Sequence, residues 1–276
     1  MTVAATGSAT TGLGTTRTVP LAIARPAGPP AATAAALQVA RRALLKYIRT
    51  PGLWAMGIVQ AGMFLFSFRY VFGGAIHTGS ISYVNYLVPA YVATIVLFTG
   101  GGIAVAVAED KTGGFTDRVL SLPVPRLSLV LGRTLADSTT NAWSIVTTAA
   151  LGFAFGFRVT GSVTGALAAF GLCLVYAVVF TVVFIVMGLF APNAQAAQGM
   201  SLIAFVFAFI SSAYVPATSM PGWLQPFSKY QPVTPMVDAV RSLLAGSTSD
   251  VGLALAWSAL LLVVCMPIAV LRYRRA

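Results

Sequence analysis

The residues of this chain that are suited to chemistry are few, and they gather in one short stretch. The segment Glu109–Arg126, EDKTGGFTDRVLSLPVPR, holds three of the six acidic residues and lies between two long apolar runs. A charged segment of this length between two membrane spans is too short to form a domain. The Gly113–Gly114 pair and the two following prolines favour a short surface helix with a kink and a stop. We interpret it as the point at which a cytoplasmic partner binds.

Catalytic and metal-binding patterns are absent from the sequence. There is no Gly-Lys dipeptide, so the chain has no Walker-type phosphate loop of its own. The single histidine, His77, lies in a Gly-rich stretch, GGAIHTGS, and forms neither a zinc motif nor a Ser/His/Asp set. We therefore predict no catalytic residues, no metal site and no cofactor in this chain. Arg133 and Asp137, four residues apart, are interpreted as a mutually neutralised pair rather than a proton relay.

The composition is that of a polytopic membrane protein. The chain is 58% hydrophobic and only 8% charged, with a mean hydropathy of +0.87, whereas a soluble domain has roughly 25% charged residues. The net charge of +11 is explained by Lys and Arg in cytoplasmic loops. No basic patch interleaved with aromatic residues supports a nucleic-acid partner.

The elements that must position the charged stretch are all helical, so the predicted fold class is all-α. About 20 apolar residues cross a bilayer as a helix. The uncharged run 159–228 covers 70 residues, or about 105 Å of helix, so it must turn back, and Ala191-Pro192-Asn193 supplies the break. Six transmembrane helices are predicted, at about 53–72, 85–108, 127–157, 163–190, 198–214 and 251–271.

The two ends of the chain are predicted to lie in the cytoplasm. Residues 1–33 are rich in Thr, Ala, Pro and Gly and are typical of a disordered tail. From Ala34, basic residues at helical spacing predict an amphipathic helix in the layer of anionic lipid headgroups. With six spans, 13 of the 17 Lys and Arg residues lie on the side of the termini and of the 109–126 loop, which the positive-inside rule makes cytoplasmic.

The segment between the fifth and sixth spans is rich in proline and aromatic residues. It is too apolar for a free loop and too interrupted for a span, so we predict short re-entrant or interfacial helices at the outer mouth. Asp238 and Arg241, three residues apart, are expected to form a surface ion pair of small energetic value.

Three blocks of this sequence resemble the type-2 ABC exporter permeases, and most of all the daunorubicin-resistance-like drug and lipid exporters. They are the 109–126 segment, LGRTLAD at Leu131–Asp137, and PGWLQPFSKYQPVTPMVDAVR at Pro221–Arg241. The resemblance covers the type-2 permease transmembrane domain, residues 34–276, and leaves out the N-terminal tail. The chain departs from the family pattern in having two glycines, Gly113 and Gly114, where one is usual.

The resemblance implies a six-span half-transporter whose coupling helix docks on a separate nucleotide-binding subunit. The coupling residues that it implies are Glu109, Asp110, Gly113, Gly114, Arg118 and Pro123. The extracellular gate residues that it implies are Pro221, Trp223, Pro232 and Arg241. ATP and Mg²⁺ would be bound by the partner ATPase, and the permease would pair with a second copy or a related permease in the cell membrane.

The function predicted from these observations is the membrane subunit of an ABC exporter that moves an amphipathic drug, a lipid or a lipid-linked molecule. The alternative is a self-sufficient ion-coupled carrier, whose transport would collapse with the ion gradient and survive removal of every ATPase. An intramembrane enzyme has little support because no catalytic set is visible.

Overall fold

The computed structural model describes residues 45, 51–74, 76, 82–114 and 126–272. The predicted tail at 1–33 therefore lies outside the described residues, as does the amphipathic helix predicted from residue 34, apart from Leu45. Arg118 and Pro123 of the predicted coupling element are likewise outside them.

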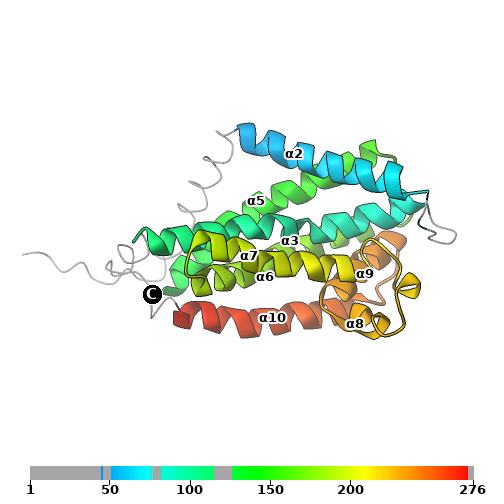
Figure 1. The fold of residues 1–276 in the computed structure, drawn as a ribbon. Helices are drawn as coiled ribbons and strands as arrows, with labels where there is room; N and C mark the ends of the chain where they lie inside the picture. Colours follow the sequence, from blue (N-terminus) through cyan, green and yellow to red (C-terminus); the bar gives the residue numbers. More distant parts are fainter. Residues whose placement is uncertain (1–44, 46–50, 75, 77–81, 115–125, 273–276) are drawn as a thin grey trace, which may run out of the picture.

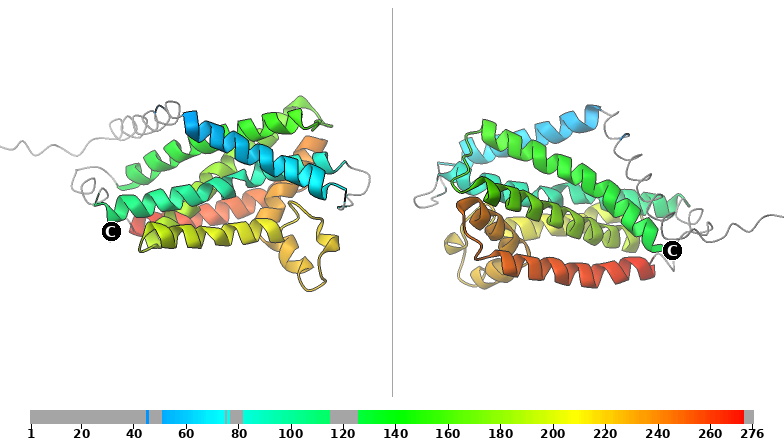
Figure 2. Two further views of the ribbon diagram at one scale, coloured as in Figure 1. Left: turned by 45° about the horizontal axis from the view of Figure 1, so that its top comes forward. Right: turned by 180° about the vertical axis from the view of Figure 1, so that it is seen from behind.

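The described part of the chain is a helical bundle without a strand. Its elements, in chain order, are α2 (Pro51–Phe66), the π-helix η1 (Ser67–Phe72), α3 (Tyr83–Thr112), α5 (Arg126–Ala154), α6 (Val163–Phe190), α7 (Ala194–Ile210), the 3-10 helix η2 (Ala217–Ser219), α8 (Gln225–Tyr230), α9 (Val233–Ala245) and α10 (Val251–Arg272). The long helices lie side by side along one direction, with α8 and α9 at one end and the end of α10 at the other (Figure 1). Figure 2 shows the same arrangement from two further sides.

Four helical segments in the described residues are long and apolar enough to cross a membrane: Ala55–Phe72, Tyr83–Thr112, Val163–Phe190 and Val251–Arg272. The polytopic, all-helical class is confirmed. The α5 helix has 29 residues and is long enough to cross a membrane. It is not among the four segments because it carries Arg133, Asp137 and many Ser and Thr residues, which lower its hydropathy. The α7 helix is apolar but has only 17 residues. The count of six spans therefore stays a prediction.

The predicted break at residues 191–193 is confirmed, and its geometry explains where α7 begins. The α6 helix ends at Phe190, and the Asn193 side chain caps α7 by accepting a hydrogen bond from the Ala196 N–H at 2.8 Å. The fifth predicted span, 198–214, therefore begins earlier, at Ala194, and ends at Ile210. Short helices do follow, as predicted, although their re-entrant placement stays a prediction.

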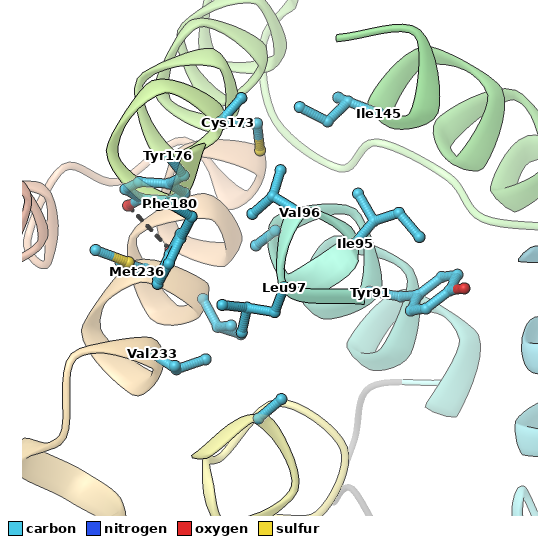
Figure 3. Packing of buried hydrophobic residues seen from close by; sticks show 14 of the residues in the cluster. Tyr91, Ile95, Val96, Leu97, Ile145, Cys173, Tyr176, Phe180, Val233 and Met236 are labelled. Carbon is cyan, nitrogen blue, oxygen red and sulfur yellow. Dashed lines mark hydrogen bonds between the residues drawn. The ribbon is translucent and has the colours of Figure 1, made fainter. Parts of the chain in front are cut away.

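The α3 helix is the centre of the bundle. It packs against α5, α6, α7 and α9, and 17 of its 30 residues are buried. Figure 3 shows Val96, Leu97 and Ile95 pointing from α3 toward different neighbours. The Tyr176 hydroxyl donates to the Met236 carbonyl at 3.2 Å and joins α6 to α9 in the same core. A helix that is apolar all round must be surrounded by protein or lipid, and α3 is surrounded by protein.

Two helices at the edge of the bundle remain exposed despite their apolar sequences. Only 11% of the residues in the apolar window of Ala55–Phe72 and 17% of those in the window of α10 are buried. Met56, Met63 and Val263 are 65–70% exposed. Exposed apolar surface of this extent is normally shielded from water by a membrane or by another protein. Membrane hydrocarbon supplies such a shield, in keeping with a membrane-integral protein.

The close approach of α6 to α3 gives a first prediction. A Cβ atom on Gly188 would overlap the Ala104 carbonyl and lie 2.7 Å from Val107 Cβ, whereas one on Gly171 of the same helix would meet no atom within 4 Å. We expect Gly188→Ala to lower the free energy of unfolding by about 2 kcal/mol through overpacking. Gly171→Ala is the matched control and should raise it slightly, because alanine favours helix. Thermal unfolding in detergent measures both, and equal melting temperatures would contradict the packing.

Candidate functional site

The described part of the charged 109–126 stretch is the last turn of α3. Glu109, Asp110 and Lys111 are helical, and the Gly113 N–H donates to the Glu109 carbonyl at 2.8 Å. Gly114 then adopts a left-handed φ of +67°, which glycine reaches without strain. The prediction of a separate surface helix is wrong for 109–112, and the two glycines end α3 rather than kink a helix. Residues 115–125 lie outside the described residues.

Asp110 is tied to the neighbouring helix α5. The Arg133 Nη1 atom donates to Asp110 Oδ2, and Arg133 Nε lies 3.4 Å from Asp137 Oδ2. The three side chains are 21–38% exposed, so water screens the cluster only in part. The predicted Arg133–Asp137 pair is confirmed, but the structure adds Asp110 as a second carboxylate from another helix. One guanidinium thus joins α3 to α5.

Lys111 ties the same turn of α3 to the end of α6. Its Nζ atom donates to the carbonyls of Leu189 and Ala191 at 3.2 and 3.3 Å. These carbonyls end α6, where the helix dipole is negative and a cation is stabilising. The last turn of α3 is therefore bonded to both α5 and α6. We call the group formed by Asp110, Lys111, Arg133 and Asp137 the clasp. Glu109 beside it is exposed and accessible to a partner.

A hydrogen-bonded cluster of three polar side chains inside the bundle was not predicted from the sequence. Thr99 donates to Asn141 Oδ1 at 2.7 Å, and Asn141 Nδ2 donates to Thr181 Oγ1 at 3.1 Å. The three residues come from α3, α5 and α6, and such hydrogen bonds hold helices together where no water competes. The signal that could have revealed it is Asn141, an amide in the middle of a predicted span.

Arg241 of α9 is the centre of a network at the opposite end of the bundle. Its guanidinium donates to the carbonyls of Tyr86, Ser212 and Ala213 at 2.8–3.3 Å. It also pairs with Asp238 Oδ1 at 3.1 Å and stacks over the Tyr86 ring at 3.7 Å. Arg241 therefore joins α9 to the start of α3 and to the segment after α7.

The predicted ion pair between Asp238 and Arg241 is confirmed, and the Asp238 side chain is 41% exposed. Its small energetic value stays a prediction. The Arg241 side chain is only 18% exposed, and Asp238 also accepts a hydrogen bond from Ser212 Oγ at 3.2 Å. Partial burial raises the pKa of the Asp238 carboxyl, and the Arg241 guanidinium opposes that rise. Arg241 also donates to three backbone carbonyls, which sequence spacing does not reveal.

The other predicted gate residues lie at the same end without forming one cluster. Pro221 is exposed, and Trp223 is 79% exposed in the turn before α8. Pro232 is the residue before α9 and sets its start. Only Arg241 of the four belongs to the buried network, so a gating role of the set stays a prediction.

The long apolar helices define the class as an α-helical membrane protein, and the comparisons with known proteins agree. Residues 35–245 match the family model described as ABC-2 type transporter. The chain belongs to this family. It is 29% identical over 264 residues to the daunorubicin resistance ABC transporter permease protein DrrB1 of Streptomyces coeruleorubidus, covering 95% of this chain and 93% of that protein. It is 26% identical over 177 residues to the probable doxorubicin resistance ABC transporter permease protein DrrC of Mycobacterium tuberculosis, covering 63% and 64%. Both relatives are named as permease proteins of ABC transporters.

Proposed function

We propose that this permease exports an amphipathic drug-like or lipid-like molecule across the cell membrane, driven by ATP that a separate nucleotide-binding subunit hydrolyses with Mg²⁺. The observation that carries the proposal is the course of α3. It is one helix of 30 residues, or about 45 Å. It begins beside Arg241 in the outer network and ends in the clasp.

This geometry supports a mechanism for coupling. A partner that moves the last turn of α3 would also move α5 and α6, because Asp110 and Lys111 are bonded to both. The displacement would reach the other end of the bundle along α3, since Tyr86 contacts Arg241 there. In this proposal Glu109 and Arg118 face the partner subunit, Gly113 and Gly114 mark the end of the rigid helix, and Pro123 ends the coupling segment.

The proposed topology has six spans with both termini in the cytoplasm. The clasp, the C-terminal end of α10 and the α6–α7 turn lie at one end, and α8 and α9 lie at the other (Figure 1). The positive-inside rule supports a cytoplasmic location for the first end. The exposed apolar surfaces of α2 and α10 offer room for lipid and for a second permease, either a second copy or a related chain. The two relatives are named for daunorubicin and doxorubicin resistance, which favours an amphipathic aromatic drug as cargo.

The test is co-purification of the chain with its candidate ATPase, comparing the wild type with Glu109→Lys plus Arg118→Glu. We expect the ATPase to accompany the wild type and the double reversal to retain at least ten-fold less of it, because charged contacts across an interface lose their complementarity. The matched control is Lys229→Glu plus Asp250→Lys at the outer end, which should retain the ATPase fully.

Two outcomes would contradict the proposal. One is the absence of any ATPase from a preparation that elutes as a single folded species. The other is transport in vesicles that persists without the ATPase and stops when the ion gradient is collapsed, which would establish the ion-coupled carrier instead.

A further inference from the structure

The outer half of the bundle contains a cavity whose lining is almost wholly apolar. It has a volume of about 190 Å³ and lies between α3, α5, α6 and α9. Representative lining residues are Val88, Val92, Ala166, Cys173 and Val240. Phe153 and Phe170 also line it and are 54% and 37% exposed, so it lies next to the exposed side of α5 and α6. An apolar cavity of about 150 Å³ already binds a molecule as large as benzene.

A second cavity adjoins the first toward the end of the bundle. It has a volume of about 150 Å³ and shares Pro89, Phe157 and Leu244 with the apolar cavity. The remainder of its lining includes Asn85, Tyr86, Arg158, Thr160 and Arg241. We call the two adjoining cavities the slot; both are largely apolar, and two arginines, Arg158 and Arg241, line the second one.

The cations at this slot differ in their availability. The Arg241 guanidinium already donates to three backbone carbonyls and pairs with Asp238. Arg158 is exposed, and its backbone N–H donates to Asn85 Oδ1 at 3.1 Å. Within the described residues, no carboxylate lies within ion-pair distance of Arg158 or of Arg69.

Arg69 lies close to the same place. A Cβ atom on Gly156, next to Phe157, would be 3.3 Å from Arg69 Nη1. Gly156 has a left-handed φ of +92° and follows α5, and the Phe157 N–H closes the turn by donating to the Gly152 carbonyl at 3.0 Å. Phe157 lines both cavities, and Arg158 lines the second. The Arg69 guanidinium, which lies 5.2 Å from the centroid of the Tyr70 ring, is close to Gly156.

From this arrangement we infer that the slot binds an anionic phospholipid of the outer leaflet, with an acyl chain in the apolar cavity and the phosphate at Arg158. The inference rests on the proposed topology, which makes this end of the bundle the outer one. An apolar cavity open to a membrane gains little from the hydrophobic effect, since lipid tails are as apolar as its walls. Dispersion contacts favour filling the apolar cavity with an acyl chain. A preference for one lipid headgroup over another must come from the arginines that line the second cavity.

Native mass spectrometry of the purified permease in mixed micelles of phosphatidylglycerol and phosphatidylcholine tests the inference without ATPase or transport. We expect the wild type to retain phosphatidylglycerol preferentially. Arg158→Gln should lower that preference about five-fold, the factor expected for one interfacial arginine. Lys229→Gln removes a cation from the same end, away from the slot, and should leave the preference unchanged.

A filling substitution tests the apolar cavity. Ala166→Phe places a ring in the cavity, whereas Ala168→Phe, two residues along the same helix, places it on the exposed face. We expect Ala166→Phe to reduce the retained lipid several-fold and Ala168→Phe to leave it unchanged. Ala149→Phe on the opposite wall repeats the test if Ala166→Phe does not fold.

Three results would overturn the inference. The first is a wild type with no preference for phosphatidylglycerol, and the second is an equal loss in Arg158→Gln and Lys229→Gln. The third is displacement of the lipid by daunorubicin in the wild type but not in Ala166→Phe, which would assign the cavity to cargo. A permease that fails to bind its ATPase but retains the anionic lipid would contradict the proposed function and leave this site intact.

Discussion

Replacing Arg241 by alanine is expected to lower the free energy of unfolding by about 3 kcal/mol. This is the lower end of the range for removing one partner of a buried ion pair, because the Asp238 side chain is 41% exposed. The substitution leaves the carbonyls of Tyr86, Ser212 and Ala213 without their donor and the Asp238 carboxylate without its counter-ion. An unpaired buried polar group costs about 1–3 kcal/mol. Thermal unfolding of the detergent-purified protein, followed by size-exclusion chromatography, measures the effect.

Two variants make this prediction specific. Arg241→Lys keeps the charge but loses the planar fork of donors, so we expect it to recover less than half of the lost stability. Lys229→Ala removes an exposed cation from α8 at the same end and should change the melting temperature by no more than about 1 °C, as for ordinary surface sites. Equal melting temperatures for Arg241→Ala and Lys229→Ala would show that the network does not hold α9 to α3.

Reversing the charge of Arg133 is expected to break the clasp and to reduce ATP-driven transport at least ten-fold. Arg133→Asp would place three carboxylates, at positions 110, 133 and 137, where one guanidinium now joins two. Repulsion and the lost pairing would cost about 2 kcal/mol at these partly exposed positions. The α3 and α5 helices would then no longer move together.

A charge swap tests whether transport depends on the ion pair itself or only on the arginine at position 133. Asp110→Arg combined with Arg133→Asp restores an ion pair between α3 and α5, and Asp137 remains able to contact the new arginine. We expect the swap to recover at least a third of the transport lost in Arg133→Asp, measured as ATP-dependent drug uptake into inside-out vesicles. Asp250→Arg, near the start of α10 at the other end, is the control and should transport normally. A swap as inactive as the single reversal would refute the clasp as a coupling contact.

The difference between the two ends of the bundle explains why these two variants should act differently. Arg241 lies in a network built mainly on backbone carbonyls, so its loss should appear first as instability. Arg133 pairs with side chains that are 24% and 38% exposed, so its reversal should appear more in transport than in folding. Measuring stability and transport on both variants distinguishes a structural contact from a coupling contact.

The sequence by itself determined the helical class, the membrane character and most helix boundaries. These features depend on hydropathy over about 20 residues and on local caps such as Asn193. They are therefore set by residues that are close together in the sequence. The 163–190 span coincides with α6, and the break after Phe190 is where Pro192 placed it. The family resemblance was likewise carried by short blocks of sequence.

Only the tertiary structure decided which partners the charged residues find. Arg241 bonds to the carbonyl of Tyr86, 155 residues away. Every residue has a backbone carbonyl, so no pattern of side chains marks the acceptor. Asp110 reaches Arg133 only because α3 and α5 pack side by side. The lipid slot depends on the packing of four helices, since a cavity is a property of assembled surfaces and not of any one segment.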